Sequence, residues 1–252
     1  MKYSLCIEPV FEGVDFYDRI QLAADAGLDA IEFWDPTPYD CDRVGKLAQQ
    51  AGVDVAICCL GDAWGNRLNE EPEAVIANYK KSVPLIKAMG CRSAIALSGD
   101  IDGKGDTQKN ILIYNLLKIA ELAEKDDITV CVEALNSIID HKGYYLDSSY
   151  TGFEILKCVD STKIKLLFDV YHMQIMEGNL IGTVTKNIKR IGHFHSAGVP
   201  GRNEHQNGET CYPAVLRAIE GAGYEGYFGM EYWPTYDSAK SLADVMEYLK
   251  KR

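Results

Sequence analysis

The chain has 252 residues, of which 47% are hydrophobic, and its formal net charge is −11. A polyanion of this sign is repelled by nucleic acid and by anionic membrane surfaces, so neither is an expected partner. No apolar run approaches the roughly 20 residues of a transmembrane helix, and the N-terminus lacks the apolar core of a signal peptide, so we expect a cytoplasmic protein.

Apolar strands alternate with helical segments through the first half of the chain. The pattern predicts strands at 3–8, 28–33, 53–59 and 93–97, and helices at 15–26, 40–51, 71–89 and about 106–125. Three of these helices stop at a glycine, a common helix end. The loop 98–106 lacks the GxxxxGK[ST] pattern and is rich in Asp, so we interpret it as a flexible βα loop and not as a phosphate cradle.

The second half keeps the same alternation. Strands are predicted at 128–133, 164–169, 190–195 and 226–231, and helices at 150–159, 172–185, 212–222 and 239–250. Eight strand–helix units predict an α/β fold, a (β/α)8 TIM barrel that forms a single domain over residues 1–252. A doubly wound open sheet is the alternative, because alternation alone does not establish closure. We expect the eight cysteines to be small buried residues, since the chain has no CxxC pair and is too large to need disulfides.

The last four predicted strands each end in an ionisable side chain, namely Glu133, Asp169, His195 and Glu231. In a barrel these strand ends converge on one mouth. Three carboxylates there repel each other, and protonation or a divalent cation relieves the repulsion. Three oxygens and one nitrogen suit Mn²⁺ or Mg²⁺, with Co²⁺ or Zn²⁺ as alternatives. The pattern therefore predicts a metal site, against the alternative of four unrelated hydrogen-bonded residues.

Three further polar residues are candidates for binding a substrate. His172 follows the sixth strand and can reach the mouth or pack against the barrel as a residue of a helix N-terminus. Arg202 follows a Pro-Gly turn and has a planar fork suited to a carboxylate, with a surface ion pair to Glu204 as the alternative. Asn136 can bind a substrate hydroxyl or cap its own loop.

Two histidines, His193 and His195, lie in the seventh predicted strand. Because strand side chains alternate, we expect one imidazole to enter the active site and the other to pack behind it on the opposite face. Glu32 and Trp34 close the second strand and are candidate walls of the pocket, with simple packing as the alternative for Trp34.

Four segments together resemble the hydroxypyruvate isomerase family: VEALN at 132–136, DVYHMQIMEGN at 169–179, GHFHSAGVPGRNE at 192–204 and MEYWP at 230–234. That family belongs to the xylose-isomerase-like TIM barrels, with the ketose 3-epimerases and 2-oxotetronate isomerases. The similarity runs nearly end to end. It implies metal binding by the four strand-end residues and acid–base roles for Glu133 and Glu231. It also implies substrate contacts by His172 and Arg202. One departure is His195, as in the epimerases, where hydroxypyruvate isomerases often have Gln.

The resemblance implies proton transfer next to a carbonyl, through an enediolate. The expected reaction is isomerisation of hydroxypyruvate to tartronate semialdehyde, or of a related 2-oxotetronate. A ketose 3-epimerase of the tagatose or psicose type is the alternative. A DNA-repair endonuclease is disfavoured by the charge of −11 and by the presence of only five histidines. A non-catalytic sugar-binding protein would not need both glutamates. The implied partners are a small sugar or oxo acid and, because family members are commonly oligomeric, further copies of the chain.

Overall fold

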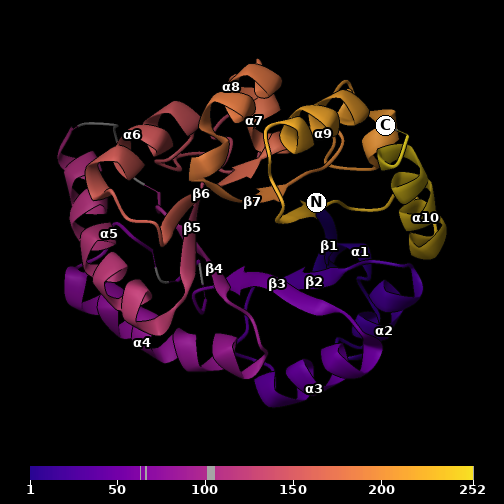
Figure 1. Cartoon of the computed structure of the whole chain (residues 1–252), viewed down its shortest axis with the longest axis horizontal. Helices are drawn as coiled ribbons and strands as arrows, with labels where there is room; N and C mark the ends of the chain where they lie inside the picture. Colours follow the sequence, from indigo (N-terminus) through magenta and orange to yellow (C-terminus); the bar gives the residue numbers. More distant parts are fainter. Residues whose placement is uncertain (63, 66, 101–105, 252) are drawn as a thin grey trace.

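The strands form a closed barrel. This computed structural model describes residues 1–62, 64–65, 67–100 and 106–251, so most of the predicted loop 98–106 lies outside the described residues. Within that part of the chain, eight strands pair in chain order and helices surround them (Figure 1). The barrel closes because β1 pairs in parallel with both β2 and β8. The predicted TIM barrel is confirmed, and the open-sheet alternative is wrong.

The strands match the predicted segments closely. They are β1 (Lys2–Cys6), β2 (Ala30–Phe33), β3 (Asp54–Cys59), β4 (Ser93–Leu97), β5 (Thr129–Glu133), β6 (Ile164–Asp169), β7 (Ile191–His195) and β8 (Tyr227–Met230). Nearly every strand residue is buried, as expected for parallel strands that are covered by helices on one face and fill a barrel on the other. β8 stops one residue earlier than predicted, so Glu231 is the first residue after it.

The helices occupy the outer layer in Figure 1. They are α1 (Ile7–Val10), α2 (Asp18–Asp25), α3 (Cys41–Ala51), α4 (Pro72–Ala88), α5 (Asp106–Asp126), α6 (Ser149–Val159), α7 (Val170–Met176), α8 (Leu180–Asn187), α9 (Tyr212–Gly221) and α10 (Ser238–Leu249). The single helix predicted at 172–185 is wrong. Gly178 and Asn179 have φ of +66° and +46°, a left-handed conformation that ends α7 and separates it from α8.

Phe194 shows how β7 divides its side chains between two faces. Its ring contacts Phe168 on β6 and Phe228 on β8, with ring centroids 6.1 and 6.0 Å apart. His193 and His195 flank it in sequence and share the other face, because the strand repeat is two residues. Their rings lie 5.1 Å apart, and both approach one carboxylate inside the barrel. The prediction that the two imidazoles point to opposite faces is therefore wrong.

Most cysteines are buried, but Cys158 and Cys211 are exposed, so the prediction of burial is wrong for these two. Cys158 lies near the end of α6, and Cys211 directly precedes α9. The described helices include none that is both long and apolar enough to cross a membrane.

Candidate active site

Four ionisable side chains meet at the carboxyl ends of β5 to β8. Glu133, Asp169 and His195 are the last residues of their strands, and Glu231 follows β8. Each offers a ligand atom, and these atoms all lie within 4.8 Å of one another. Nδ1 of His195 is 3.2 Å from Oε1 of Glu133 and 3.4 Å from Oε2 of Glu231. The structure therefore brings together the four residues predicted to bind a metal.

The ionisable groups of this cluster are buried and shift the pKa values of one another. Burial raises the pKa of Asp169 above its ordinary value, and Arg202 only partly offsets this. Burial would also raise the pKa of Glu231, but Arg202 and His195 hold it well below the usual range. Burial disfavours the charged form of His195, yet Glu231 and Glu32 raise its pKa. Three buried carboxylates with one imidazole form an oxygen-rich donor set that fits a divalent cation.

Arg202 lies beside the cluster with its guanidinium held from several sides. Its Nη2 is 2.5 Å from Oε2 of Glu231 and 3.9 Å from Oδ2 of Asp169. Its Cζ lies 5.3 Å from the ring centre of Tyr171 and 5.1 Å from that of Trp233. The buried Nε has no hydrogen-bond partner among the described residues. Arg202 also lines the cavity over the cluster, so its planar guanidinium can face an anionic group bound there.

The predicted alternative for Arg202, a surface ion pair with Glu204, is wrong. Glu204 is fully buried and accepts hydrogen bonds from Ser241 and from the backbone and hydroxyl of Thr235. These contacts anchor the segment after β7 to the segment after β8. Glu204 thus supports the loop that carries Arg202.

His172 and Asn136 contact each other behind the cluster. Nδ1 of His172 lies 3.2 Å from the backbone N and 2.7 Å from the side-chain N of Asn136, and its Nε2 lies 3.4 Å from Oδ2 of Asp169. Oδ1 of Asn136 accepts from the backbone N–H groups of Ile139 and Asp140, so Asn136 caps its own loop. Both side chains are fully buried and lie outside the cavity wall. Their contact with a substrate stays a prediction.

A cavity of about 280 Å³ lies over the cluster and reaches Glu133, His195, Arg202 and Glu231. Its walls include all three tryptophans of the chain: Trp34, Trp64 and Trp233. The cavity therefore combines a charged floor with aromatic walls, a combination typical of small-molecule sites.

Sequence reasoning misses several wall residues, among them Trp64 and His141. The ring of His141 stacks on Trp64, with centroids 5.4 Å apart and an angle of 18° between the planes. Both come from loops, where no strand-end pattern marks them. Trp34 was predicted as a wall or as packing. It is a wall residue that also donates from Nε1 to Oε1 of Glu231 at 2.5 Å.

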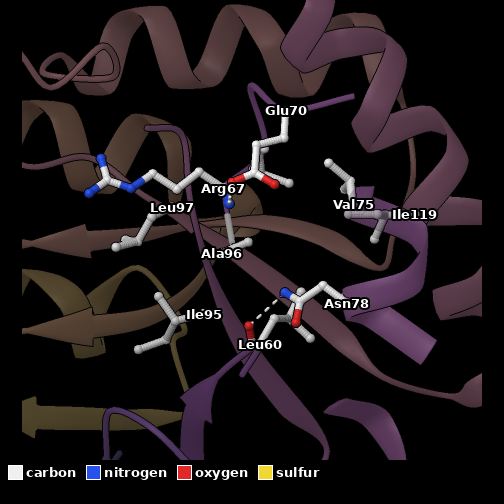
Figure 2. A pocket seen from close by; sticks show the side chains of 10 residues that line it. Leu60, Arg67, Glu70, Val75, Asn78, Ile95, Ala96, Leu97 and Ile119 are labelled. Atoms are coloured by element: carbon white, nitrogen blue, oxygen red, sulfur yellow. Dashed lines mark hydrogen bonds between the residues drawn. The ribbon is translucent and has the colours of Figure 1, made fainter. Parts of the chain in front are cut away.

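A second cavity lies between β4 and the outer segments that carry Leu60, Asn78 and Ile119 (Figure 2). Asn78 closes one side of it by donating from Nδ2 to the backbone oxygen of Leu60 at 2.8 Å. The cavity holds about 10 Å³, which is the lower limit for a single water molecule. It is a packing gap and offers no room for a substrate.

Glu32 does not line the main cavity, so its predicted place in the pocket wall is wrong. It lies in the barrel with 1% exposure. Burial alone would raise its pKa, but the charges and hydrogen bonds of His193 and His195 lower it to about 2. The carboxylate therefore stays ionised inside the barrel.

Comparison with known proteins identifies the family of this chain. The family model described as "Xylose isomerase-like TIM barrel" matches residues 20–252. The 2-oxo-tetronate isomerase of Cupriavidus necator is 30% identical, over 98% of each chain. The hydroxypyruvate isomerase of Escherichia coli is 28% identical, over 93% of this chain and 94% of that one. A crystal structure described as AP endonuclease, family 2, from Brucella melitensis matches with a TM-score of 0.91 at 28% identity, over 98% of this chain and 99% of that one. With its closed barrel and its match over most of its length, the chain belongs to the xylose isomerase-like TIM barrel family.

Proposed function

We propose that the protein is an isomerase that moves a proton between neighbouring carbons of a small sugar or oxo acid. The expected reaction converts hydroxypyruvate to tartronate semialdehyde, or isomerises a related 2-oxotetronate. The main observation behind this proposal is that three carboxylates and one imidazole lie together beneath a cavity, with Arg202 beside them. Support comes from relatives named 2-oxo-tetronate isomerase and hydroxypyruvate isomerase, which match over almost their whole length.

Glu133, Asp169, His195 and Glu231 would hold one divalent cation, Mn²⁺ or Mg²⁺ by the chemistry of the donors. A carboxylate with a reference pKa near 4 is too weak a base to remove a proton next to a carbonyl unaided. When bound, the cation would act as a Lewis acid that stabilises the negative charge of the enediolate.

Glu133 and Glu231 are the proposed acid–base pair. One removes the proton from the substrate carbon, and the other delivers a proton to the neighbouring carbon. Glu133 ends β5 and Glu231 directly follows β8, and these two strands are separated by two others in the barrel, so the glutamates can approach a substrate from two sides. The indole N–H of Trp34 and the guanidinium of Arg202 each hold one oxygen of Glu231 and fix its orientation.

A nucleic acid substrate is disfavoured despite the likeness to a structure described as an AP endonuclease. The net charge of −11 repels a phosphate backbone, and three of the four clustered side chains are carboxylates. A ketose 3-epimerase is the second candidate, because the third ligand position is His195, as in the epimerases that the sequence resembles. Both reactions use the same glutamates and cation, so the product must decide between them.

Product analysis in D₂O tests the proposal. The purified protein with Mn²⁺ is incubated with hydroxypyruvate, a 2-oxotetronate and a set of neutral ketoses, and the products are followed by NMR. We expect hydroxypyruvate to give an aldehyde and a 2-oxotetronate to give a 3-oxo acid, each with deuterium on the former carbonyl carbon. An epimerase instead inverts C3 of a ketose and leaves its carbonyl at C2. Fast inversion of C3 without turnover of any oxo acid would replace the first choice by the second.

Arg202→Lys tests whether the substrate is anionic. Lysine keeps the charge but loses the planar fork that Tyr171 and Trp233 hold in place. We expect KM for a carboxylated substrate to rise by roughly tenfold or more, as for a lost charge-assisted hydrogen bond, and KM for a neutral ketose to change little. Arg43→Lys is the matched control, since Arg43 also lies over an aromatic ring, that of Tyr17, but lines no part of the cavity. Equal kinetics of both variants on every oxo acid would remove Arg202 from the substrate site.

A further inference from the structure

Glu32 lies in the barrel beneath the cluster of four ionisable residues and binds three side chains from other strands. Its Oε2 is 2.6 Å from Nε2 of His193 and 3.4 Å from Nε2 of His195, both on β7. Its Oε1 accepts from the hydroxyl of Ser4 on β1 at 3.2 Å. The exposed fractions of all four residues are 2% or less. The carboxylate is thus fixed by hydrogen bonds from two elements.

His195 connects Glu32 to the cluster. Its Nδ1 faces Glu133 and Glu231, while its Nε2 faces Glu32. A neutral imidazole carries one proton, and the nitrogen without it offers the lone pair that binds a metal. With the proton on Nε2, the N–H is donated to Glu32 and the lone pair of Nδ1 points at the cluster. Histidines that bind metals commonly donate their other N–H to a carboxylate in this way.

We propose that Glu32 is a positioning residue that holds the N–H of His195 and thereby presents Nδ1 to the cation. The inference rests on the proposed function, because it presupposes that the four-residue cluster binds a metal. His193 and Ser4 act one step further away, by holding the carboxylate of Glu32 against the ring of His195. Glu32 itself does not line the cavity.

The packing of β8 supports this arrangement. A Cβ at Gly229 would lie 2.1 Å from Oε1 of Glu32 and 2.9 Å from Cδ2 of His195. The backbone there is not left-handed, so the reason for a glycine is space alone. Gly229 on β8 therefore leaves room for the carboxylate of Glu32 to lie against the ring of His195.

A competing reading is a second cation between Glu32, His193 and His195, whose ligand atoms also lie within 4.8 Å of one another. Two observations oppose it. The contact between Glu32 and His193 is already a hydrogen bond at 2.6 Å, and the second oxygen of Glu32 is taken by Ser4. Metal stoichiometry separates the two readings: we expect one Co²⁺ per chain, and two would overturn the proposal.

Co²⁺ binding to Glu32→Gln is the central test, because Co²⁺ reports both affinity and ligand geometry by its visible absorption. We expect an affinity loss of about 10- to 100-fold and a changed absorption spectrum, since an amide can donate to Nε2 and favour the wrong tautomer. Glu8→Gln is the matched control. Glu8 is a half-buried carboxylate near the mouth that accepts from the backbone N–H of Trp34 and is not one of the four clustered residues. We expect it to keep the affinity and the spectrum of the parent protein.

A double-mutant cycle with His195→Ala tests whether Glu32 acts through His195. We expect Glu32→Gln to cause no further loss of affinity once the imidazole is gone, and additive losses would overturn the proposal. Unchanged Co²⁺ affinity in Glu32→Gln alone would overturn it too. If His195→Ala itself keeps full affinity, the metal site of the proposed function fails instead.

Should the Gln variant not fold, as judged by circular dichroism, Glu32→Asp takes its place. It keeps the charge but withdraws the carboxylate by one methylene, and the same loss is expected.

Discussion

Asp169→Asn is expected to lower the affinity for Mn²⁺ by at least about 100-fold. This exceeds the loss expected for Glu32→Gln, because Asp169 is a proposed ligand and Glu32 only positions one. Asp169 ends β6 and also caps α7, because its Oδ1 accepts from the backbone N–H groups of Tyr171 and His172. Its Oδ2 faces the cluster, 3.9 Å from Nη2 of Arg202. An asparagine keeps the capping oxygen in place and puts an NH₂ group where the ligand oxygen stood. The substitution therefore removes a ligand while it preserves the local fold.

Mn²⁺ content after dialysis and titration calorimetry measure this loss. Asp35→Asn is the matched control, because Asp35 lines the same cavity but is not one of the four clustered residues. We expect Asp35→Asn to bind Mn²⁺ like the parent protein. If Asp169→Asn keeps full occupancy at the Mn²⁺ concentration that half-saturates the parent, Asp169 is not a ligand.

The barrel and the cluster at its mouth could be predicted because both follow from local pattern. The strands are four to six residues long and mostly apolar, and the polar residues that end β5, β6 and β7 mark where the chain leaves the barrel. The predicted bounds of β4 and β6 are confirmed, and Glu133, Asp169 and His195 end their strands as expected. Parallel strands in a closed barrel then bring these ends together without further information.

The walls of the cavity and the support beneath it could not be predicted in the same way. Trp64 and His141 meet from separate loops, and no periodicity marks a contact between loops. Glu32 and His193 are 161 residues apart in sequence, so their hydrogen bond depends on how the barrel closes. The predicted face of His193 is wrong for a different reason. Residues two apart in a strand point to the same face, so the sequence itself places His193 beside His195.

Glu133→Gln and Glu231→Gln are each expected to lower turnover by about 10²- to 10⁴-fold at saturating Mn²⁺, the usual contribution of general acid–base catalysis. Glutamine keeps the size of the side chain and an oxygen that can face the cation, but it cannot take or deliver the proton. Mn²⁺ occupancy is measured in the same samples, so that a loss of metal is not mistaken for a loss of proton transfer. Glu8→Gln is the control for the loss of one nearby carboxylate and should keep its turnover, because Glu8 binds a backbone N–H and lies outside the cavity wall.

Hydrogen exchange assigns the two glutamates to the two steps. In D₂O, a variant that keeps the group that removes the proton still exchanges the substrate C–H for deuterium, although it makes little product. The variant that has lost this group exchanges almost none. We therefore expect Glu133→Gln and Glu231→Gln to be alike in turnover but opposite in exchange. The two residues differ in their surroundings, since Glu231 is held by Trp34 and Arg202 while Glu133 contacts His195.

Turnover within tenfold of the parent protein in either variant, at full metal occupancy, would exclude that glutamate from the proton transfer. Loss of exchange in both variants would mean that a single step needs both carboxylates, and the division of roles between β5 and β8 would be wrong.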